Sequence, residues 1–378
     1  MNKYKVVEKK GEGTFSEVVQ VKHLHTGKYA AIKCMKAKYG NIDEVNDLRE
    51  IQALRRLSPH PNIVQLYEVL FDRPTGRLAL VFEIMDLNLY ELIQHRQQRL
   101  PGRHVKIYMY QLFQALDFMH KKGIFHRDIK PENILINKSS KTLKLADLGS
   151  CRGIYSKPPF TEYISTRWYR APECLLTSGG YGPEMDVWGA GCVHFEIMTL
   201  YPVFPGNDEI DQISRIHKIL GTPDHRFIQG LKTRGNSSSC DFIPRKGTGI
   251  APLIPFATKS CIDFVTRALE YKKERRLTAE KAIFHPYFSD KKAKLTISLP
   301  QSYDDFASEK KPLHETVGYH SNSLPNIDTG QISNKSKSSS WTERRKVFET
   351  VSLRVWYYGA IICKLLFTCS YIQSRRYT

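Results

Sequence analysis

Residues 4–85 alternate between short runs rich in β-branched and aromatic side chains and clusters of turn-forming residues. Such runs predict β-strands, and they lie at residues 4–7, 18–23, 29–35, 63–71 and 78–82. Between the third and fourth runs, residues 46–57 place apolar side chains at helical spacing, at Leu48, Ile51, Leu54 and Leu57. The N-terminal part is therefore expected to form a small sheet with one helix.

From about residue 87 onward, the apolar positions follow a helical period instead. The clearest stretches are residues 105–121, 183–200 and 261–271. Residues 222–258 are rich in Gly, Pro and Ser and show little periodicity, so we expect an insert between helices there. The pattern predicts an α+β fold with a small β-rich N-terminal lobe at about 4–85 and a larger helical C-terminal lobe at about 86–288.

The composition changes after residue 288. Residues 289–378 are basic and contain a serine run at 338–340, which predicts a mobile tail. Near the end of the tail, residues 355–372 are mostly apolar but include Lys364, and a lysine at the centre of a membrane-spanning helix costs about 2.5–3.5 kcal/mol. This apolar segment fits an unstructured tail, a docking helix or, least favoured, a membrane contact.

The charge of the chain indicates which partners to expect, and its cysteine content indicates the cellular compartment. The chain has 57 Lys and Arg against 38 Asp and Glu, a formal net charge of +19, which favours anionic partners. No aromatic stacking motif is interleaved with the basic residues, so no specific nucleic acid is expected as a partner, and most of the charge is expected to be solvated surface. The eight cysteines form no C-x-x-C pair, and residues 1–10 contain no apolar leader, so we expect an intracellular protein with reduced thiols.

A glycine-containing turn separates the first two predicted strands, in Gly11-Glu12-Gly13-Thr14-Phe15-Ser16-Glu17-Val18. Glycines let the backbone come close to phosphate oxygens, although this motif alone also fits a plain hairpin. Lys33 ends the third predicted strand, where a buried amine needs a partner such as a phosphate or Glu50 of the predicted helix. Neither signal is specific on its own.

A more specific signal is the sequence His126-Arg127-Asp128-Ile129-Lys130-Pro131-Glu132-Asn133, which Ala146-Asp147-Leu148-Gly149 follows. Two carboxylates and an asparagine, in loops that close short apolar strands, suit a catalytic base and ligands for Mg²⁺. Asp128 is better placed than His126 to be the base, and His126 is expected to be a packed residue of the loop. Together with Lys33 and Ala171-Pro172-Glu173, these motifs rarely arise in this order by chance.

Over residues 4–288 the chain resembles the eukaryotic protein kinases, and within them the cyclin-dependent and mitogen-activated kinase group. The narrower resemblance is carried by Thr161-Glu162-Tyr163, Thr166-Arg167-Trp168-Tyr169-Arg170, Asp186-Val187-Trp188-Gly189 and Leu220-Gly221-Thr222-Pro223. The resemblance implies the bilobal protein-kinase fold, ATP and Mg²⁺ as cofactors, and protein substrates. Because Lys130 precedes Pro131, the catalytic loop resembles that of serine/threonine-specific rather than tyrosine-specific kinases.

The resemblance also implies roles for individual residues. Those that would cover or hold ATP are Lys10, Gly11, Glu12, Gly13, Thr14, Phe15, Ser16, Glu17, Val18, Ala31, Lys33, Glu50, Phe82, Glu83, Met85 and Leu135. Asp128 would accept the proton of the substrate hydroxyl, and Lys130 would steady the γ-phosphate. The Mg²⁺ ligands would be Asn133 and Asp147, and the structural residues would be Glu173 paired with Arg276, together with Asp186.

By the same resemblance, Thr161 and Tyr163 lie in an activation loop and are expected to be phosphorylated by an upstream kinase or by the chain itself. The arginines expected to receive these phosphates are Arg49, Arg127 and Arg152 for Thr161, and Arg167 and Arg170 for Tyr163. Arg170 also implies a preference for proline directly after the phosphorylated residue.

Two positions depart from the commonest kinase sequence. Leu148 stands where phenylalanine is usual, and Ser16 replaces the third glycine of the glycine-rich loop. Both are compatible with activity, so we expect a change in packing alone. A pseudokinase that binds ATP without transferring phosphate is the alternative, but no catalytic position is lost. The expected location is the cytoplasm, with the nucleus as a second compartment.

Overall fold

The computed structural model describes residues 3–156, 166–177, 179–232 and 242–289, all within the compact unit Met1–Asn326. Residues 290–378 lie outside the described residues. The prediction of a mobile tail and of the apolar segment 355–372 therefore falls outside the described residues, and so do Thr161 and Tyr163.

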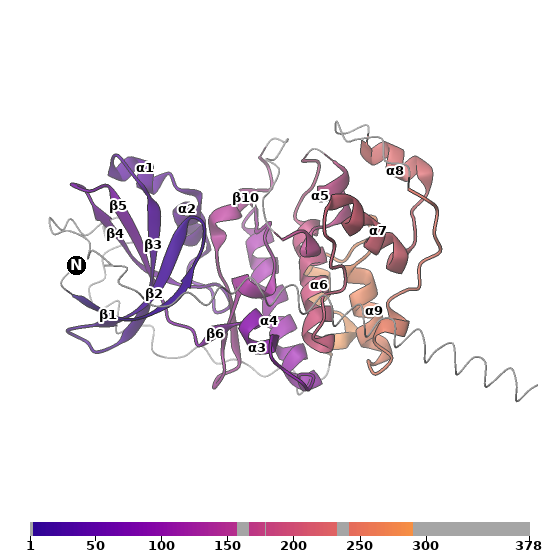
Figure 1. Cartoon of the computed structure of the whole chain (residues 1–378), viewed down its shortest axis with the longest axis horizontal. Helices are drawn as coiled ribbons and strands as arrows, with labels where there is room; N and C mark the ends of the chain where they lie inside the picture. Colours follow the sequence, from indigo (N-terminus) through magenta and orange to yellow (C-terminus); the bar gives the residue numbers. More distant parts are fainter. Residues whose placement is uncertain (1–2, 157–165, 178, 233–241, 290–378) are drawn as a thin grey trace, which may run out of the picture. The chain divides into compact units, whose positions relative to one another are not determined.

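The N-terminal lobe is built on a five-stranded antiparallel sheet in the order β1-β2-β3-β5-β4 (Figure 1). The strands are β1 (Tyr4–Glu12), β2 (Ser16–His23), β3 (Tyr29–Lys38), β4 (Leu66–Asp72) and β5 (Arg77–Phe82). Strand β5 shows why the alternating pattern predicted a sheet. Its residues Leu78 and Leu80 pack into the main core with Ile51, whereas Ala79 and Val81 face a second apolar cluster.

The helix expected at 46–57 begins three residues later, as α2 (Arg49–Leu57), and a separate short helix that was not expected, α1 (Ile42–Asn46), precedes it. The Asn41 side chain caps α1 by accepting the Glu44 N–H, a capping signal that the apolar spacing does not contain. Leu48 has an extended backbone and separates the two helices. Helix α2 buries Ile51 completely, so the predicted apolar face is present although the helix starts later.

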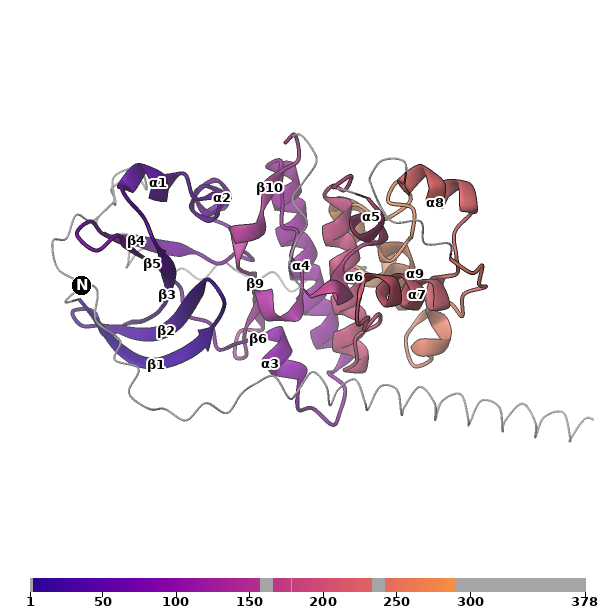
Figure 2. The same cartoon turned by 45° about the horizontal axis from the view of Figure 1, so that its top comes forward.

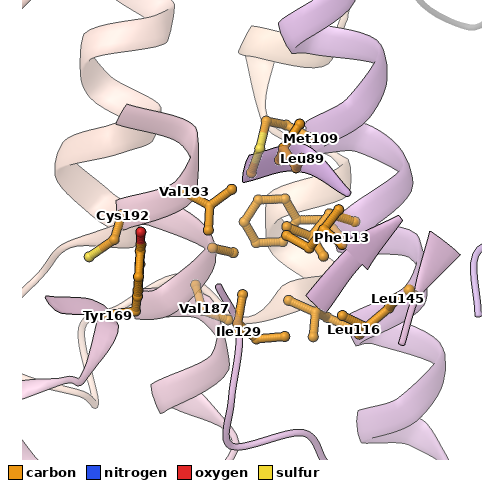
Figure 3. Packing of buried hydrophobic residues seen from close by; sticks show 14 of the residues in the cluster. Leu89, Met109, Phe113, Leu116, Ile129, Leu145, Tyr169, Val187, Cys192 and Val193 are labelled. Atoms are coloured by element: carbon orange, nitrogen blue, oxygen red, sulfur yellow. The ribbon is translucent and has the colours of Figure 1, made fainter. Parts of the chain in front are cut away.

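The C-terminal lobe is organised around two long helices, α4 (Gly102–Lys121) and α6 (Glu184–Thr199). Residues Met185 to Met198 of α6 are buried, which makes α6 the central helix of this lobe. Side chains of α4, such as Phe113 and Leu116, point toward Val187 and Val193 of α6 (Figure 3). This contact gives the catalytic loop a rigid base, because the loop follows α4 along the chain.

Shorter elements complete this lobe. They are β6 (Leu87–Asn88), α3 (Leu89–Ile93), β7 (Ile124–Phe125), η1 (Pro131–Asn133), β8 (Ile134–Asn137), β9 (Thr142–Leu145), η2 (Leu148–Ser150), β10 (Arg152–Gly153), η3 (Arg167–Tyr169), α5 (Pro172–Leu176), α7 (Glu209–Leu220), α8 (His225–Lys232), η4 (Ala251–Leu253), α9 (Lys259–Ala268), α10 (Ala279–Ile283) and η5 (Pro286–Phe288). Strands β6, β8 and β9 form a small sheet, and β9 lies against α4 (Figure 2).

Residues 222–258, predicted to be an insert with little periodicity, nevertheless contain a helix, α8. This helix buries Ile228 but is too short to stand out in a window rich in polar residues. Helix α9 begins at Lys259, where the Thr258 hydroxyl accepts the Cys261 N–H, rather than at the predicted residue 261. In the described part of the chain, no helix is long and apolar enough to cross a membrane.

Candidate functional site

The catalytic loop is fixed by a buried aspartate of α6. The Asp186 carboxylate accepts the backbone N–H groups of His126 and Arg127, both at 2.8 Å. It also lies 2.9 Å from Nε2 of His120, at the end of α4. Arg127 has a left-handed backbone with φ 73°, a conformation that costs free energy unless its surroundings hold it. Asp186 therefore ties α4 and α6 to the loop and sets the path of the chain into Asp128.

Asp128 is almost fully buried at the end of this loop. Its Oδ2 accepts hydrogen bonds from Lys130 Nζ at 2.8 Å and from Asn133 Nδ2 at 2.9 Å. Asn133 Nδ2 also donates to the Asp128 carbonyl at 2.8 Å. These contacts hold the carboxylate in one orientation beside a lysine ammonium group, as a base that takes a proton from a bound hydroxyl requires.

His126 links the two loops that carry the candidate carboxylates. Its Nδ1 accepts the Asp128 N–H at 3.2 Å, so its Nε2 carries the proton and donates to the Ala146 carbonyl at 3.0 Å. The ring is fully buried. His126 thus has the packed, bridging position expected from the sequence, with both ring nitrogens engaged.

The predicted Lys33–Glu50 pair is present. Lys33 Nζ lies 2.7 Å and 2.9 Å from the two Glu50 oxygens, and 3.2 Å from Asp147 Oδ1. Burial alone would lower the pKa of Lys33, but the two carboxylates outweigh it and raise that pKa. Burial would likewise raise the pKa of Asp147, and the Lys33 ammonium holds it below its usual value. Lys33 is therefore charged and Asp147 ionised at neutral pH.

Asp147 and Asn133 fit the ligand chemistry of a hard divalent cation. Asp147 has a left-handed backbone with φ 60°, and its side chain is 46% exposed although Lys33 contacts it. The amide nitrogen of Asn133 is directed to Asp128, which leaves the amide oxygen as its donor toward a metal. Two protein oxygens are fewer than the six that Mg²⁺ needs, so nucleotide phosphates and water would supply the others.

The glycine-rich segment forms the turn between β1 and β2. The Gly13 N–H donates to the Ser16 carbonyl at 2.8 Å, and Phe15 at the tip is 77% exposed. Within this segment Glu12 pairs with Lys9 and with Lys36 of β3, and these bonds lower the pKa of Glu12 to about 2. Of the other predicted ATP-covering residues, Lys10 and Gly11 lie on β1, Glu17 and Val18 lie on β2, and Thr14 lies in the turn between them.

The predicted adenine-binding residues lie where the sheet passes into the second lobe. Phe82, the last residue of β5, pairs with Ala31 of β3. Glu83 uses its N–H to donate to the Gln65 carbonyl at 3.1 Å, so its carbonyl is the backbone group left for a nucleotide. Met85 is half-buried on the connection, and Leu135 lies on β8.

Lys144 of β9 was missed by the sequence reasoning. It is buried, and its Nζ lies 2.8 Å from Oε1 of Glu83, which positions the connection between the lobes. The signal was present as a lysine between Leu143 and Leu145 in an apolar strand, where a charge requires a partner.

The predicted phosphate-binding arginines form two groups. Arg127 Nη1 donates to the Ser150 carbonyl at 3.2 Å, Arg152 pairs with Phe125 across β10 and β7, and α2, which begins at Arg49, packs against η2, so the first three arginines come together. Burial lowers the pKa of Arg152, and the charges of Arg49 and Arg127 lower it further. Arg167 and Arg170 form the second group, and each has a nitrogen 4.0 Å from Oε1 of Glu209. Because Thr161 and Tyr163 lie outside the described residues, their distances to either group are not part of the described geometry.

The predicted Glu173–Arg276 pair is buried and bidentate, at 2.7 Å and 3.0 Å. Arg276 also donates to the Glu184 carbonyl at 2.9 Å, which joins this pair to the start of α6. Leu148, which replaces the usual phenylalanine, is 1% exposed and packs in the main core. The expectation that leucine can pack at this position is confirmed.

Comparisons with known proteins agree with this geometry. The family model described as protein kinase domain matches residues 4–288. The chain is 52% identical over 320 residues to the MAPK/MAK/MRK overlapping kinase of Mus musculus, which covers 85% of this chain and 76% of that relative. It is 51% identical over 292 residues to the Homo sapiens protein of the same name, covering 77% of this chain and 69% of the relative. It is also 40% identical over 288 residues to the serine/threonine-protein kinase MAK of Mus musculus, covering 76% of this chain and 46% of that relative.

Proposed function

The chain belongs to the protein kinase family and is a serine/threonine protein kinase that uses ATP, and from this premise we propose three finer properties. It uses Mg²⁺ with ATP, it prefers substrates with proline directly after the phosphorylated residue, and it is activated by phosphorylation of the loop that contains Thr161 and Tyr163. Protein substrates follow from the family, and the activating phosphate comes from an upstream kinase or from the chain itself.

The buried polar network around Asp128 supports the transfer step. The substrate hydroxyl oxygen forms the bond to the γ-phosphorus, its proton passes to Asp128, and the bond from the γ-phosphorus to ADP breaks. Lys130 donates a hydrogen bond to Oδ2 of Asp128, so its ammonium group is close enough to steady the transferred phosphoryl group. Mg²⁺ held by Asn133 and Asp147 would neutralise charge on the phosphates. Lys33, ordered by Glu50, neutralises phosphate charge from the other lobe.

The proline preference is supported by how the segment before α5 is held. The Trp168 indole N–H donates to the Gly206 carbonyl at 2.8 Å, and the Tyr169 hydroxyl donates to Glu196 at 2.6 Å. Arg170 follows with a side chain that is 13% exposed. An ordered, largely buried arginine beside the substrate position would shape a pocket that accepts the ring of proline.

A peptide-library phosphorylation screen tests the proline preference. We expect proline to be enriched directly after the phosphorylated Ser or Thr. Arg170→Ala should weaken that enrichment more than it lowers total transfer, and Arg215→Ala, at a half-buried arginine of α7 that pairs with Asp211, is the matched control. A screen without proline enrichment at this position would contradict the proposed proline preference but not the kinase activity.

The arginine cluster Arg49, Arg127 and Arg152 is the observation that carries the proposed activation. Three guanidinium groups held close together repel one another, and a phosphate with about −1.5 to −2 charge relieves that repulsion. Arg49 directly precedes Glu50 on α2, so a phosphate bound there would favour the Lys33–Glu50 pair.

The activation is tested by measuring kinase activity before and after phosphatase treatment, beside a Thr161→Ala/Tyr163→Phe variant. We expect both the treatment and the substitutions to lower kcat. If neither lowers it, the loop is not a phosphorylation switch, although the enzyme is still a kinase.

A further inference from the structure

Arg127 is held at both its backbone and its side chain by one short segment at the start of α6. Asp186 accepts the Arg127 N–H at 2.8 Å and so stabilises its left-handed backbone. Tyr181, just before α6, accepts a hydrogen bond from Arg127 Nη2 at 2.7 Å. The guanidinium carbon also lies 5.6 Å from the centre of the Tyr181 ring. The hydroxyl and the ring of Tyr181 thus both contact this arginine.

The Tyr181 ring is itself supported by the core. It meets the fully buried ring of Phe125 edge to face, with centroids 6.5 Å apart and an interplanar angle of 76°. Phe125 directly precedes His126 in the catalytic loop. Packing against a rigid part of the loop therefore sets the direction of the tyrosine hydroxyl.

Tyr181 lies beside the concentration of positive charge formed by the three arginines. Burial raises the pKa of Tyr181 although Arg127 acts against this, so the hydroxyl is neutral at physiological pH. The Ser150 carbonyl, which Arg127 Nη1 contacts at 3.2 Å, is also neutral. Neither of these two acceptors carries a negative charge, so both orient Arg127 without neutralising it.

We propose that Tyr181 is a positioning residue of this arginine cluster, which orders the Arg127 guanidinium before the phosphorylated activation loop binds it. An arginine side chain has many rotamers in solution, and ordering it in advance reduces the entropy lost when the phosphate binds. This role rests on the proposed activation by loop phosphorylation. Tyr181 thereby couples the phosphate to the catalytic loop and to α6.

The test compares each full-length variant with itself. For each protein, kcat/KM is measured with the loop phosphorylated, at a stoichiometry checked by intact mass, and again after phosphatase treatment. Tyr181→Phe keeps the ring on Phe125 and removes only the hydroxyl, so the fold is retained, which melting temperature verifies. We expect the ratio of the two activities to fall by about ten-fold, the effect of losing one hydrogen bond to a charged group.

Two further variants separate positioning from a structural effect. Tyr155→Phe removes a hydroxyl from a tyrosine that is 93% exposed and should leave the activation ratio as in the wild type. In an Arg127→Lys background, which lacks the planar guanidinium, Tyr181→Phe should lower the ratio no further.

The possible results distinguish this role from the proposed activation. A wild-type ratio of one means that loop phosphorylation does not activate the enzyme, and the role of Tyr181 fails with it. If the wild type is activated and Tyr181→Phe is activated as strongly or more strongly, only the role of Tyr181 is overturned. The same conclusion holds if Tyr181→Phe lowers the ratio equally in the Arg127→Lys background.

Discussion

Three aspartates near the catalytic loop differ in chemistry because their partners differ. Asp186 is buried and accepts two backbone N–H groups, so it holds the backbone of the catalytic loop in place. Asp147 faces the Lys33 ammonium, which keeps its pKa low and its oxygens ionised. Asp128 is almost fully buried and accepts hydrogen bonds from Lys130 and Asn133, and it is the proposed base. The resemblance to kinases implied a different role for each of these three aspartates, and their neighbours in the structure supply the physical reason for the difference.

The first prediction concerns Asp128. Asp128→Asn keeps the shape of the side chain and the acceptor for Lys130 but removes the base, so kcat should fall by about 10²- to 10⁴-fold. Melting temperature and the affinity for ATP should stay close to those of the wild type. Transfer of radioactive γ-phosphate measures the effect, with Asp117→Asn on α4 as the matched control. Activity within two-fold of the wild type would show that Asp128 is not the base.

A contact between two side chains could be predicted only where both residues belong to recognised kinase motifs. Lys33 and Glu50 are far apart in the sequence, yet the resemblance to kinases paired them, and the structure has that pair. Lys144 and Tyr181 belong to no motif that was considered, because their partners Glu83 and Arg127 are defined by the packing of distant segments. A single sequence contains no signal of such a long-range pairing beyond the unusual placement of a charged or polar residue.

At the scale of elements, long periodic helices were predictable and several shorter elements were not. Residues 105–121 and 183–200 were expected to be helical, and they lie in α4 and α6. Strands β8 and β9 correspond to the short apolar strands expected beside the catalytic motifs, whereas helix α7 and strand β6 escaped prediction. A two-residue strand such as β6 has too few positions to show alternation. Tertiary contacts, such as those of β9 with α4, stabilise such short strands.

The second prediction concerns the ion pair that joins α5 to the base of α6. Arg276→Met leaves the Glu173 carboxylate buried without its bidentate partner, so the free energy of unfolding should fall by about 3–5 kcal/mol. Chemical denaturation measures this loss. A Glu173→Gln/Arg276→Met double variant should recover part of the stability, because no unpaired charge then stays buried.

The matched control for that prediction is Lys121→Met on α4. Lys121 forms exposed ion pairs with Asp117 and Glu280, and exposed pairs contribute little because water and salt screen them. If Arg276→Met changes the denaturation midpoint no more than Lys121→Met does, the buried pair does not stabilise the fold.

At the scale of the whole molecule, backbone hydrogen bonds connect the two lobes, in addition to the side-chain contacts of the candidate site. The Val64 N–H donates to the Leu145 carbonyl at 2.9 Å, and the Leu145 N–H donates to the Asn62 carbonyl at 2.8 Å. Asn62 in turn donates to Gln111 of α4 at 2.9 Å. These bonds place β9, and so Asp147 beyond it, at a fixed position under the sheet that carries Lys33. The pattern of apolar positions predicted two lobes, but these backbone hydrogen bonds between the lobes could not be located without the fold.

The high net charge of +19 is a property of the whole chain, and its consequence for partners follows from where the charges lie. Many described basic groups have acidic partners, which neutralises their fields locally. Such pairs include Lys3–Glu68, Lys9–Glu12, Lys33–Glu50, Lys36–Glu12, Lys144–Glu83, Arg215–Asp211 and Arg267–Asp263. The excess positive charge is therefore expected to act as a diffuse, solvated field rather than as a groove that reads nucleic acid.

The last prediction tests, on the full chain, whether the positive charge acts as such a diffuse field. Binding to duplex DNA through phosphates alone weakens steeply with salt, and a protein with 6–10 phosphate contacts loses about 10³–10⁵ in affinity between 50 and 200 mM salt. We expect retention on a DNA column at low salt, complete elution before about 200 mM, and equal retention on a shuffled duplex, because contacts to phosphates carry no sequence information. Kinase activity toward a peptide should be unaffected by added DNA at 150 mM salt. Retention that persists above 200 mM, or that depends on the DNA sequence, would contradict the diffuse-field interpretation and identify nucleic acid as a specific partner.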